Sequence, residues 1–268
     1  MAREASGVID HYTRSGLLDR IDAALAAAGH DPASPTVEAL SELDHLHGGG
    51  FGTTVVQAEL AGIPRGAHVL DAGCGIGGPS RYLASVYDCT VEGVDLTPDY
   101  VAVARTLNRR TGLDGRITVT EGSVTDLPQA DARFDVVLCQ NVSMNVADKE
   151  AMAAEAHRVL RPGGIYTISH VAEGPAGAPI YPLPWARTPE VSFLGRPEEM
   201  LETLRRAGFR DVRDRMGEGR ADPGGGHSKG AIGPGPAMGD DMAERLANVV
   251  RSLEEGRLVS MLLVARKG

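Results

Sequence analysis

Apolar residues recur at two different spacings along the chain, and the change between them divides it into two parts. Through the first 62 residues they repeat at helical spacing, as in Leu17, Ile21 and Leu25. From residue 63 onward, short apolar runs typical of buried strands alternate with helical patterns. We therefore expect a helical segment over 1–62, followed by an α/β domain over 63–268 whose parallel sheet carries helices on both faces.

One stretch, from His68 to Pro79, is the feature around which the α/β pattern is organised. A short apolar strand leads into a turn with glycines at 73, 75, 77 and 78, and Pro79 suits the first turn of the next helix. A strand, a glycine turn and a helix N-terminus form a nucleotide-cofactor crevice at the carboxyl end of a parallel sheet. A purely structural turn and an NAD(P)-binding turn are the competing interpretations.

Two acidic residues at strand ends distinguish between these interpretations. Asp71 closes the strand before the first glycine, where a carboxylate would repel a pyrophosphate but attract a cationic amine or sulfonium. Asp95 closes the next strand, 90–96, at the usual place for a carboxylate that accepts hydrogen bonds from ribose hydroxyls. The two acids therefore disfavour a dinucleotide pyrophosphate.

Four motifs in order carry a family resemblance. They are the glycine turn with its strand, Val94-Asp95, Gly122-Ser-Val-Thr-Asp-Leu-Pro128 and Arg161-Pro-Gly-Gly164. Together they resemble a class I S-adenosylmethionine-dependent methyltransferase, in the small-molecule group that includes sarcosine/dimethylglycine and ubiquinone/menaquinone-type methyltransferases. The resemblance implies a seven-stranded Rossmann-like sheet with helices on both faces and an N-terminal helical cap. It also implies that the last strand, 258–265, runs antiparallel beside the fifth, 165–170.

The resemblance implies S-adenosyl-L-methionine as the cofactor and assigns residues to it. The glycines would approach the methionine and ribose portions, Asp71 the amino end and Asp95 the ribose. Ser123 stands where relatives often have an aspartate for the adenine amino group, so Asp126 is an alternative adenine contact, beside the Val124 backbone N–H. The assigned residues are Asp71, Gly73, Gly75, Gly77, Asp95, Leu96, Ser123, Val124 and Gln140.

The acceptor side of the expected site holds amides and histidines. Gln140 and Asn141 end the fourth strand, 134–140, and Asn145 follows shortly after. Neutral amides are not strong bases, but they can orient an acceptor by hydrogen bonding. His170, at the end of the fifth strand, and His47 are therefore the candidate bases. The catalytic candidates are His47, Asn141, Asn145 and His170, with His11 and Tyr12 as further candidates in the first helix.

His47 belongs to an unusual stretch that begins at Asp44 and is followed by a helix from about residue 54. A metal site is one interpretation, but four ligands at suitable spacing are not visible, and we expect no metal. A plain glycine turn is the second. The resemblance supplies the third, since some relatives carry an Asp-x-x-His-x-Gly-Gly stretch over the methionine end of the cofactor and the substrate.

Two Gly- and Pro-rich insertions interrupt the α/β pattern near 171–196 and 217–257. The first contains the only tryptophan, Trp185, and leaves the carboxyl end of the fifth strand. Long loops at that edge often cover active sites, so we predict that these insertions act as lids. A surface loop is the alternative for the first.

Composition limits the classes of partner. The net charge is −9 and only 4% of residues are aromatic, which argues against nucleic-acid binding. No apolar run has the character of a signal peptide or a membrane span. Three cysteines, all in or beside expected strands, predict reduced packing residues of a cytoplasmic protein. We expect a monomer or homodimer.

The expected function is methyl transfer to a small-molecule acceptor, on nitrogen or carbon, in bacterial specialised metabolism. An NAD(P)-dependent oxidoreductase is one alternative, disfavoured by Asp71 and by the lack of a catalytic Tyr-x-x-x-Lys. A non-catalytic S-adenosylmethionine-binding regulator is the other.

Overall fold

A single mixed sheet runs through the computed structural model, which describes residues 2–13, 16–45, 49–218 and 241–268. Its seven strands lie in the order β3-β2-β1-β4-β5-β7-β6. β7 is antiparallel to both of its neighbours, and the other paired strands are parallel, which confirms the predicted fold. The strands are β1 (His68–Ala72), β2 (Thr90–Asp95), β3 (Ile117–Glu121), β4 (Phe134–Gln140), β5 (Leu160–Glu173), β6 (Phe209–Asp214) and β7 (Leu258–Lys267).

Helices cover both faces of this sheet. One face packs on α4 (Gly50–Ala61), α5 (Gly78–Val86) and α6 (Pro98–Arg110), and the other on α7 (Lys149–Val159) and α8 (Pro197–Arg206). The buried strands read as near-continuous apolar runs because both faces are covered. The predicted domain boundary between residues 62 and 63 falls just after α4, whose Ala58 and Ala61 share a core with the sheet.

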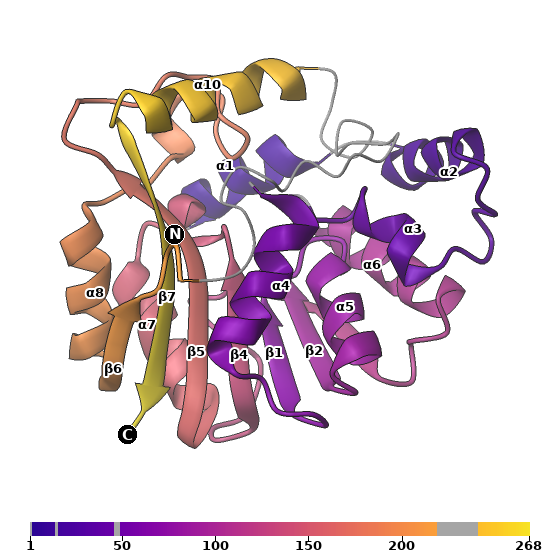
Figure 1. The fold of residues 1–268 in the computed structure, drawn as a ribbon, viewed down its shortest axis with the longest axis horizontal. Coiled ribbons are helices and arrows are strands. Elements are labelled where there is room, and N and C mark those ends of the chain that lie inside the picture. Colours follow the sequence, from indigo (N-terminus) through magenta and orange to yellow (C-terminus); the bar gives the residue numbers. More distant parts are fainter. Residues whose placement is uncertain (1, 14–15, 46–48, 219–240) are drawn as a thin grey trace.

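The remaining helices gather at the edge to which the parallel strands point. Figure 1 shows α1 (Ala2–Tyr12) and α10 (Met242–Glu254) above that edge, with α2 (Leu17–Ala27) and α3 (Val37–Ser41) beyond α5 and α6. Two short 3₁₀ turns lie there too, η1 (Ser143–Asn145) after β4 and η2 (Pro189–Val191) in the long loop. Segments from both ends of the sequence, α1 and α10, therefore cover the carboxyl ends of the parallel strands.

Two boundaries differ from the sequence prediction. β5 begins at Leu160, so Arg161-Pro-Gly-Gly164 lies within the strand rather than ending the preceding helix. The register between β4 and β5 shifts between Phe134 and Val136, and this irregularity absorbs the extra residues. α4 begins at Gly50 and not near residue 54, because Gly49 adopts the left-handed conformation that caps it.

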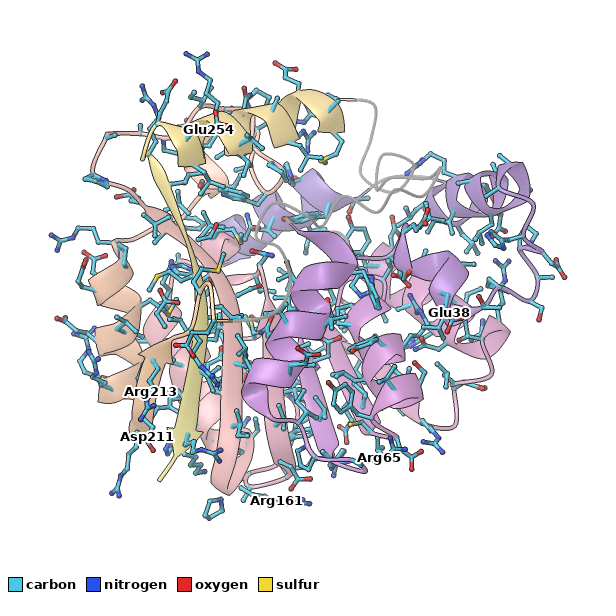
Figure 2. All side chains as sticks on the ribbon, in the orientation of Figure 1. Glu38, Arg65, Arg161, Asp211, Arg213 and Glu254 are labelled. Atoms are coloured by element: carbon cyan, nitrogen blue, oxygen red, sulfur yellow. The ribbon has the colours of Figure 1, made fainter. Side chains whose placement is uncertain are left out.

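Charged side chains mark the opposite, amino end of the parallel strands. The exposed Arg65 and Arg161 lie there, well away from α10 (Figure 2). Among the described residues, no helix has the length and apolar character needed to cross a membrane.

Candidate active site

A cavity of about 420 Å³ opens at the carboxyl edge of β1, β2 and β4, under α1. This is the crevice in which open α/β sheets bind ligands. Its wall contains every cofactor residue assigned from the sequence except Gly77, together with Asn141 and Asn145. The lining residues are Val8, Tyr12, Asp44, Asp71, Gly73, Cys74, Gly75, Pro79, Asp95, Leu96, Thr97, Tyr100, Gly122, Ser123, Val124, Thr125, Asp126, Gln140, Asn141, Val142, Asn145, Val146, Ala147 and Asp148.

The glycine turn forms the floor of this cavity. Gly73 has a φ of 80°, and a Cβ placed on it would meet Val142 Cγ2 at 2.2 Å. Gly75 has a φ of 53°, and a Cβ placed on it would meet nothing within 4 Å. The first glycine is therefore required by packing, whereas the second leaves open space where a ligand can approach the backbone. Gly77 lies outside the wall and caps α5 in the left-handed conformation.

Asp95 is held in place by the turn itself. One carboxylate oxygen accepts from the Gly75 N–H at 2.8 Å and the other from the Thr97 N–H at 2.9 Å. Burial raises the pKa of Asp95 above its ordinary value, although these hydrogen bonds oppose the shift. The carboxylate thus links the end of β2 to the glycine turn and faces the cavity in a fixed orientation.

Asp71 lies deeper, at the end of β1. It is 1% exposed, and one oxygen accepts from the Ser80 hydroxyl at 2.6 Å. Burial raises its pKa to about 6, with a smaller contribution from the nearby Asp95 charge. A buried carboxylate with a raised pKa is stabilised when a cation is placed beside it.

A buried ion pair fastens the N-terminal segment to this floor. Asp44 Oδ2 accepts from Arg81 Nη2 at 2.8 Å, and both side chains are almost completely buried. Arg81 also donates to the Ile76 carbonyl and to Asn108 Oδ1, each at 2.8 Å. A Cβ on Gly78 would lie 2.5 Å from the Asp44 carbonyl oxygen, so a glycine is needed where the segment crosses α5.

Arg81 is the important residue that sequence reasoning missed. Burial pushes the pKa of Asp44 upward, but the Arg81 charge and then the His45 charge outweigh this and hold it below its ordinary value. An arginine in the first buried turn of α5 was the available signal, because buried arginines are nearly always paired. Asp44 itself had been noticed only as part of the His47 stretch.

The expected adenine end consists of a compact turn after β3. The Ser123 hydroxyl accepts from the Thr125 N–H at 3.2 Å and lies 2.7 Å from the Thr125 hydroxyl. Val124 is buried against the core beside it, and Asp126 is exposed at the rim. The structure thus brings both alternatives, Ser123 and Asp126, to the same side of the cavity.

The side-chain amides of Gln140 and Asn141 on the acceptor side differ in their hydrogen bonding. Gln140 accepts from the Thr54 hydroxyl at 3.1 Å and donates to Gln57 Oε1 at 2.8 Å, which ties β4 to α4. Asn141 has a φ of 51°, and its backbone N–H is held by Ser169. Within the described part of the chain, the Asn141 side chain makes no hydrogen bond, so this amide can bind a ligand.

His170 and His11, the two histidine candidates among the described residues, lie outside the cavity wall. His170 is 2% exposed, lies outside the wall, and places Nδ1 2.6 Å from the Ser143 hydroxyl. Burial, and then the Lys149 charge, lower its pKa to about 3, so it is neutral at physiological pH. His47 lies outside the described residues. His11 faces the long loop, with Nε2 2.9 Å from the Pro184 carbonyl.

The titratable groups of the described wall are the five aspartates, Cys74, Tyr12 and Tyr100. Burial raises the pKa of Cys74 well above its ordinary value, so it stays a thiol. Burial, then Tyr100 and Asp95, raise the pKa of Tyr12 strongly. Negative charge therefore dominates this wall, and no group of three His, Cys, Asp or Glu side chains suited to a metal occurs among the described residues.

Trp185 belongs to a small core and not to the cavity wall. It is 5% exposed and packs with Met144, Leu183 and Leu258, and its indole N–H donates to the Ser192 hydroxyl at 3.0 Å. The loop after β5, 174–196, is therefore packed against the domain along part of its length. The second insertion includes residues 219–240, which lie outside the described residues.

Comparison with known proteins agrees with this architecture. Residues 70–168 match the family described as a methyltransferase domain. A sarcosine/dimethylglycine N-methyltransferase of Halorhodospira halochloris is 34% identical over 148 residues, which are 54% of this chain and 52% of that protein. The chain thus spans about half the length, or less, of the first curated relatives it matches.

Two solved structures share the fold over nearly the whole chain. The geranyl diphosphate C-methyltransferase of Streptomyces coelicolor A3(2) has a TM-score of 0.68 at 15% identity, covering 99% of this chain and 98% of that one. The [4+2]-cyclase SpnF has a TM-score of 0.62 at 23% identity, covering 94% of both chains. At these identities the likeness concerns the fold alone.

The sheet order and the crevice define the class of protein as one with the methyltransferase fold. Residues 70–168 match the methyltransferase-domain family, and this match confirms the predicted resemblance to class I S-adenosylmethionine-dependent methyltransferases. The residues present fit such a cofactor, because Gly75 leaves room for close approach and two carboxylates, the buried Asp71 and the partly buried Asp95, line the cavity where a cationic ligand would lie.

Proposed function

We propose that this chain is an S-adenosylmethionine-dependent methyltransferase that acts on a small molecule. The observation that carries the proposal is the convergence of Asp71, Gly75 and Asp95 on one cavity at the carboxyl edge of the sheet. The match of residues 70–168 to a methyltransferase domain supports it. When bound, the cofactor supplies a methyl group on a sulfonium, an activated donor that needs no covalent enzyme intermediate.

The cofactor contacts follow from the floor of the cavity. Asp95, already oriented by two backbone N–H groups, accepts from the ribose hydroxyls. Asp71 offers a buried negative charge to the amino group, and Leu96 covers the adenine. Ser123 and the Val124 backbone border the adenine edge, with Asp126 beside them. The protein's task is positioning and exclusion of water, which are the main needs of an in-line methyl transfer.

The acceptor is a neutral or cationic molecule with apolar surface. The wall carries aspartates and apolar groups such as Val8 and Val146, and its described residues include no lysine, arginine or histidine. The geranyl diphosphate enzyme is described in complex with Mg²⁺, and the described residues here include no group of three His, Cys, Asp or Glu side chains suited to a metal that would screen a diphosphate from this negative charge. An amine nitrogen or a neutral carbon nucleophile fits this wall better, in keeping with N- or C-methylation.

Asn141 is the residue we assign to acceptor orientation. Its left-handed backbone, just after the end of β4, is fixed by Ser169 of β5, and the residue lines the cavity. Non-glycine residues with positive φ are rare and tend to occur at functional sites. His170 is buried outside the wall, so the geometry gives it no direct contact with an acceptor. The catalytic roles of His170 and His47 stay predictions.

Three broader expectations remain proposals. We propose a role in bacterial specialised metabolism, because the high content of alanine, glycine and arginine suits a GC-rich bacterial gene. A cytoplasmic location and a monomeric or homodimeric state follow from the sequence alone. None of the three bears on how the site works.

The test is methyl transfer from radiolabelled S-adenosylmethionine to a panel of amines, phenols and enolisable carbonyl compounds. We expect a labelled product formed in step with S-adenosylhomocysteine, and its loss in Asp95→Ala. The exposed Arg65→Ala is the matched control and should keep full activity. Cofactor binding without transfer to any acceptor would instead support a regulator or a chemistry such as that of the [4+2]-cyclase. Binding of NADPH but not of S-adenosylhomocysteine would indicate an oxidoreductase.

A further inference from the structure

Asn145 lies where three separate segments meet above the cavity. Its Oδ1 accepts from the Tyr12 hydroxyl of α1 at 2.9 Å. Its Nδ2 donates to the Trp185 carbonyl at 2.8 Å and to the Val191 carbonyl at 2.9 Å, both in the 174–196 loop. One side chain from η1 therefore bonds to the N-terminal helix and to two points of the loop.

These bonds occupy the polar groups of the amide. A side-chain amide has two N–H donors, and both of those on Asn145 are taken by backbone carbonyls. A partly buried amide so engaged has no N–H left for an acceptor molecule. Asn145 differs in this from Asn141, whose amide is available.

We call the set of Asn145 hydrogen bonds to α1 and to the 174–196 loop the joint. Other contacts show that the joint holds the loop more firmly than it holds α1. The Phe193 N–H donates to the Met144 carbonyl at 2.7 Å, and the Lys149 ammonium donates to the Phe193 carbonyl. The loop is thus fastened to η1 and to the start of α7 beside it. Helix α1 contacts the loop through His11 and at Gly7, where an added Cβ would lie 3.0 Å from Val191 Cγ1.

Tyr12 is the part of the joint that reaches the ligand space. It lines the cavity, its ring packs edge-on against Tyr100 at a centroid distance of 5.9 Å, and the charge of Asp95 acts on its hydroxyl. Because the raised pKa keeps that hydroxyl protonated, it serves as a donor to Asn145 over the whole working pH range.

We propose that Asn145 is a positioning residue: it sets the place of Tyr12 over the cavity by joining α1 to the 174–196 loop. It acts through Tyr12 and does not itself touch the acceptor. The proposal rests on the proposed function only in taking the cavity ligand to be S-adenosylmethionine or its product.

Two single variants separate the two sides of the joint. Tyr12→Phe removes only the bond to α1. Asn145→Asp keeps an acceptor for the Tyr12 hydroxyl but places a carboxylate against the Trp185 and Val191 carbonyls. Ser192→Ala is the matched control, since it removes a hydrogen bond of the same loop without touching Asn145.

The readouts need no turnover. Hydrogen exchange of the amides of residues 8–12 reports on α1, and acrylamide quenching of Trp185, the sole tryptophan, reports on the loop. We expect Tyr12→Phe to speed exchange in α1 about fivefold, as the loss of one hydrogen bond implies, and to leave quenching unchanged. Asn145→Asp should raise quenching and leave α1 exchange nearly unchanged. Ser192→Ala should not speed exchange in α1.

The affinity for S-adenosylhomocysteine tests whether the joint affects ligand binding in the cavity. We expect Tyr12→Phe to weaken it about fivefold to tenfold, and the double variant Tyr12→Phe with Asn145→Ala to weaken it no more than Asn145→Ala alone. Additive losses, or unchanged α1 exchange in a folded Tyr12→Phe protein, would overturn the proposal. If wild type binds no S-adenosylhomocysteine but the exchange pattern appears as expected, the proposed function fails and the joint between Asn145 and Tyr12 stands.

Discussion

The floor and the cover of the cavity are held together by different kinds of interaction. The floor consists of the glycine turn, the carboxylates at the ends of β1 and β2, and the buried pair between Arg81 of α5 and Asp44 of the N-terminal segment. The cover consists of α1, η1 and the 174–196 loop, and α1 is held there by neutral side-chain hydrogen bonds such as Tyr12 to Asn145. A buried charge pair costs far more to break than a neutral hydrogen bond.

This difference assigns the two regions different tasks. A floor that does not open keeps the cofactor groups in one geometry, which is what an in-line transfer requires. A cover joined by single hydrogen bonds opens locally at small cost, so ligands can enter and leave. The N-terminal segment takes part in both, since Asp44 belongs to the floor and Tyr12 to the cover. Removing residues 1–50 would therefore damage the floor as well, and a truncated chain would not keep its cofactor affinity.

The largest expected effect follows from breaking the floor. Asp44→Leu leaves the Arg81 guanidinium buried without its carboxylate, and we expect the free energy of unfolding to fall by about 3–5 kcal/mol. Urea denaturation measures this loss. Tyr12→Phe, which breaks one bond of the cover, should cost only about 1 kcal/mol by the same method.

A second variant tests whether the pair itself is the cause. Asp44→Leu combined with Arg81→Leu removes both charges, and we expect it to recover a large part of the lost stability. If the double variant is as unstable as Asp44→Leu alone, packing around Asp44 and not its charge holds the segment to the floor.

The next largest effect concerns cofactor binding at the turn. Gly75→Val should abolish binding of S-adenosylhomocysteine in a calorimetric titration, because the side chain would project into the open space above the turn and strain a φ of 53°. The matched control is Gly66→Val, which bears a comparable strain at a φ of 73° away from the cavity, also with nothing within 4 Å of its Cβ. Binding retained by a folded Gly75→Val protein would remove this turn from the site.

A smaller loss is expected when the floor loses the Asp95 carboxylate. Asp95→Ala should weaken S-adenosylhomocysteine binding by about 1–3 kcal/mol, since the ribose loses a charged acceptor. Asp95→Asn keeps one oxygen acceptor and should lose less. Equal affinity in wild type and Asp95→Ala would mean that the carboxylate only orders the Gly75 and Thr97 backbone.

The smallest effect is a pH dependence that originates at Asp71. Burial raises its folded pKa to about 6, so its carboxylate takes up a proton as the pH falls through that value. The ionised form attracts the amino group, and affinity for S-adenosylhomocysteine should fall up to about tenfold between about pH 7 and pH 5. Asp71→Asn should show a much flatter profile over this range.

Stability should change in the opposite sense over the same range. An acid whose folded pKa lies above its unfolded value binds protons more readily when folded, so protonation of Asp71 stabilises the ligand-free protein as the pH falls from about 6 toward 4. Thermal unfolding without ligand checks this sign. A ligand-free stability that falls over this range by the same amount in wild type and Asp71→Asn would exclude Asp71 as its source.

The floor could be predicted from the sequence because its signals are local. Gly73, Gly75, Asp71 and Asp95 stand at fixed offsets from strand ends, and parallel strands bring their carboxyl ends to one edge. The seven strands and the antiparallel last strand beside the fifth are implied by the resemblance and agree with the structure.

The cover could not be predicted in the same way, because its contacts join residues far apart in sequence. The bond between Tyr12 and Asn145 spans 133 positions, and no periodicity marks it. His170 looked like a cavity residue because it lies in a strand that ends near the site, but it faces Ser143 in the interior. The sequence also does not show that Trp185 packs in a small core with residues from η1 and β7, and the lid role of its loop stays a prediction.

The most direct test of the central claim is a crystal structure of the protein soaked with S-adenosylhomocysteine. The account predicts that the ligand lies over the Gly73–Gly75 turn, with both ribose hydroxyls within hydrogen-bond distance of the Asp95 carboxylate and the amino group on the side of Asp71. Ligand density at another place on the molecule, or a ligand in this cavity with its ribose directed away from Asp95, would contradict it.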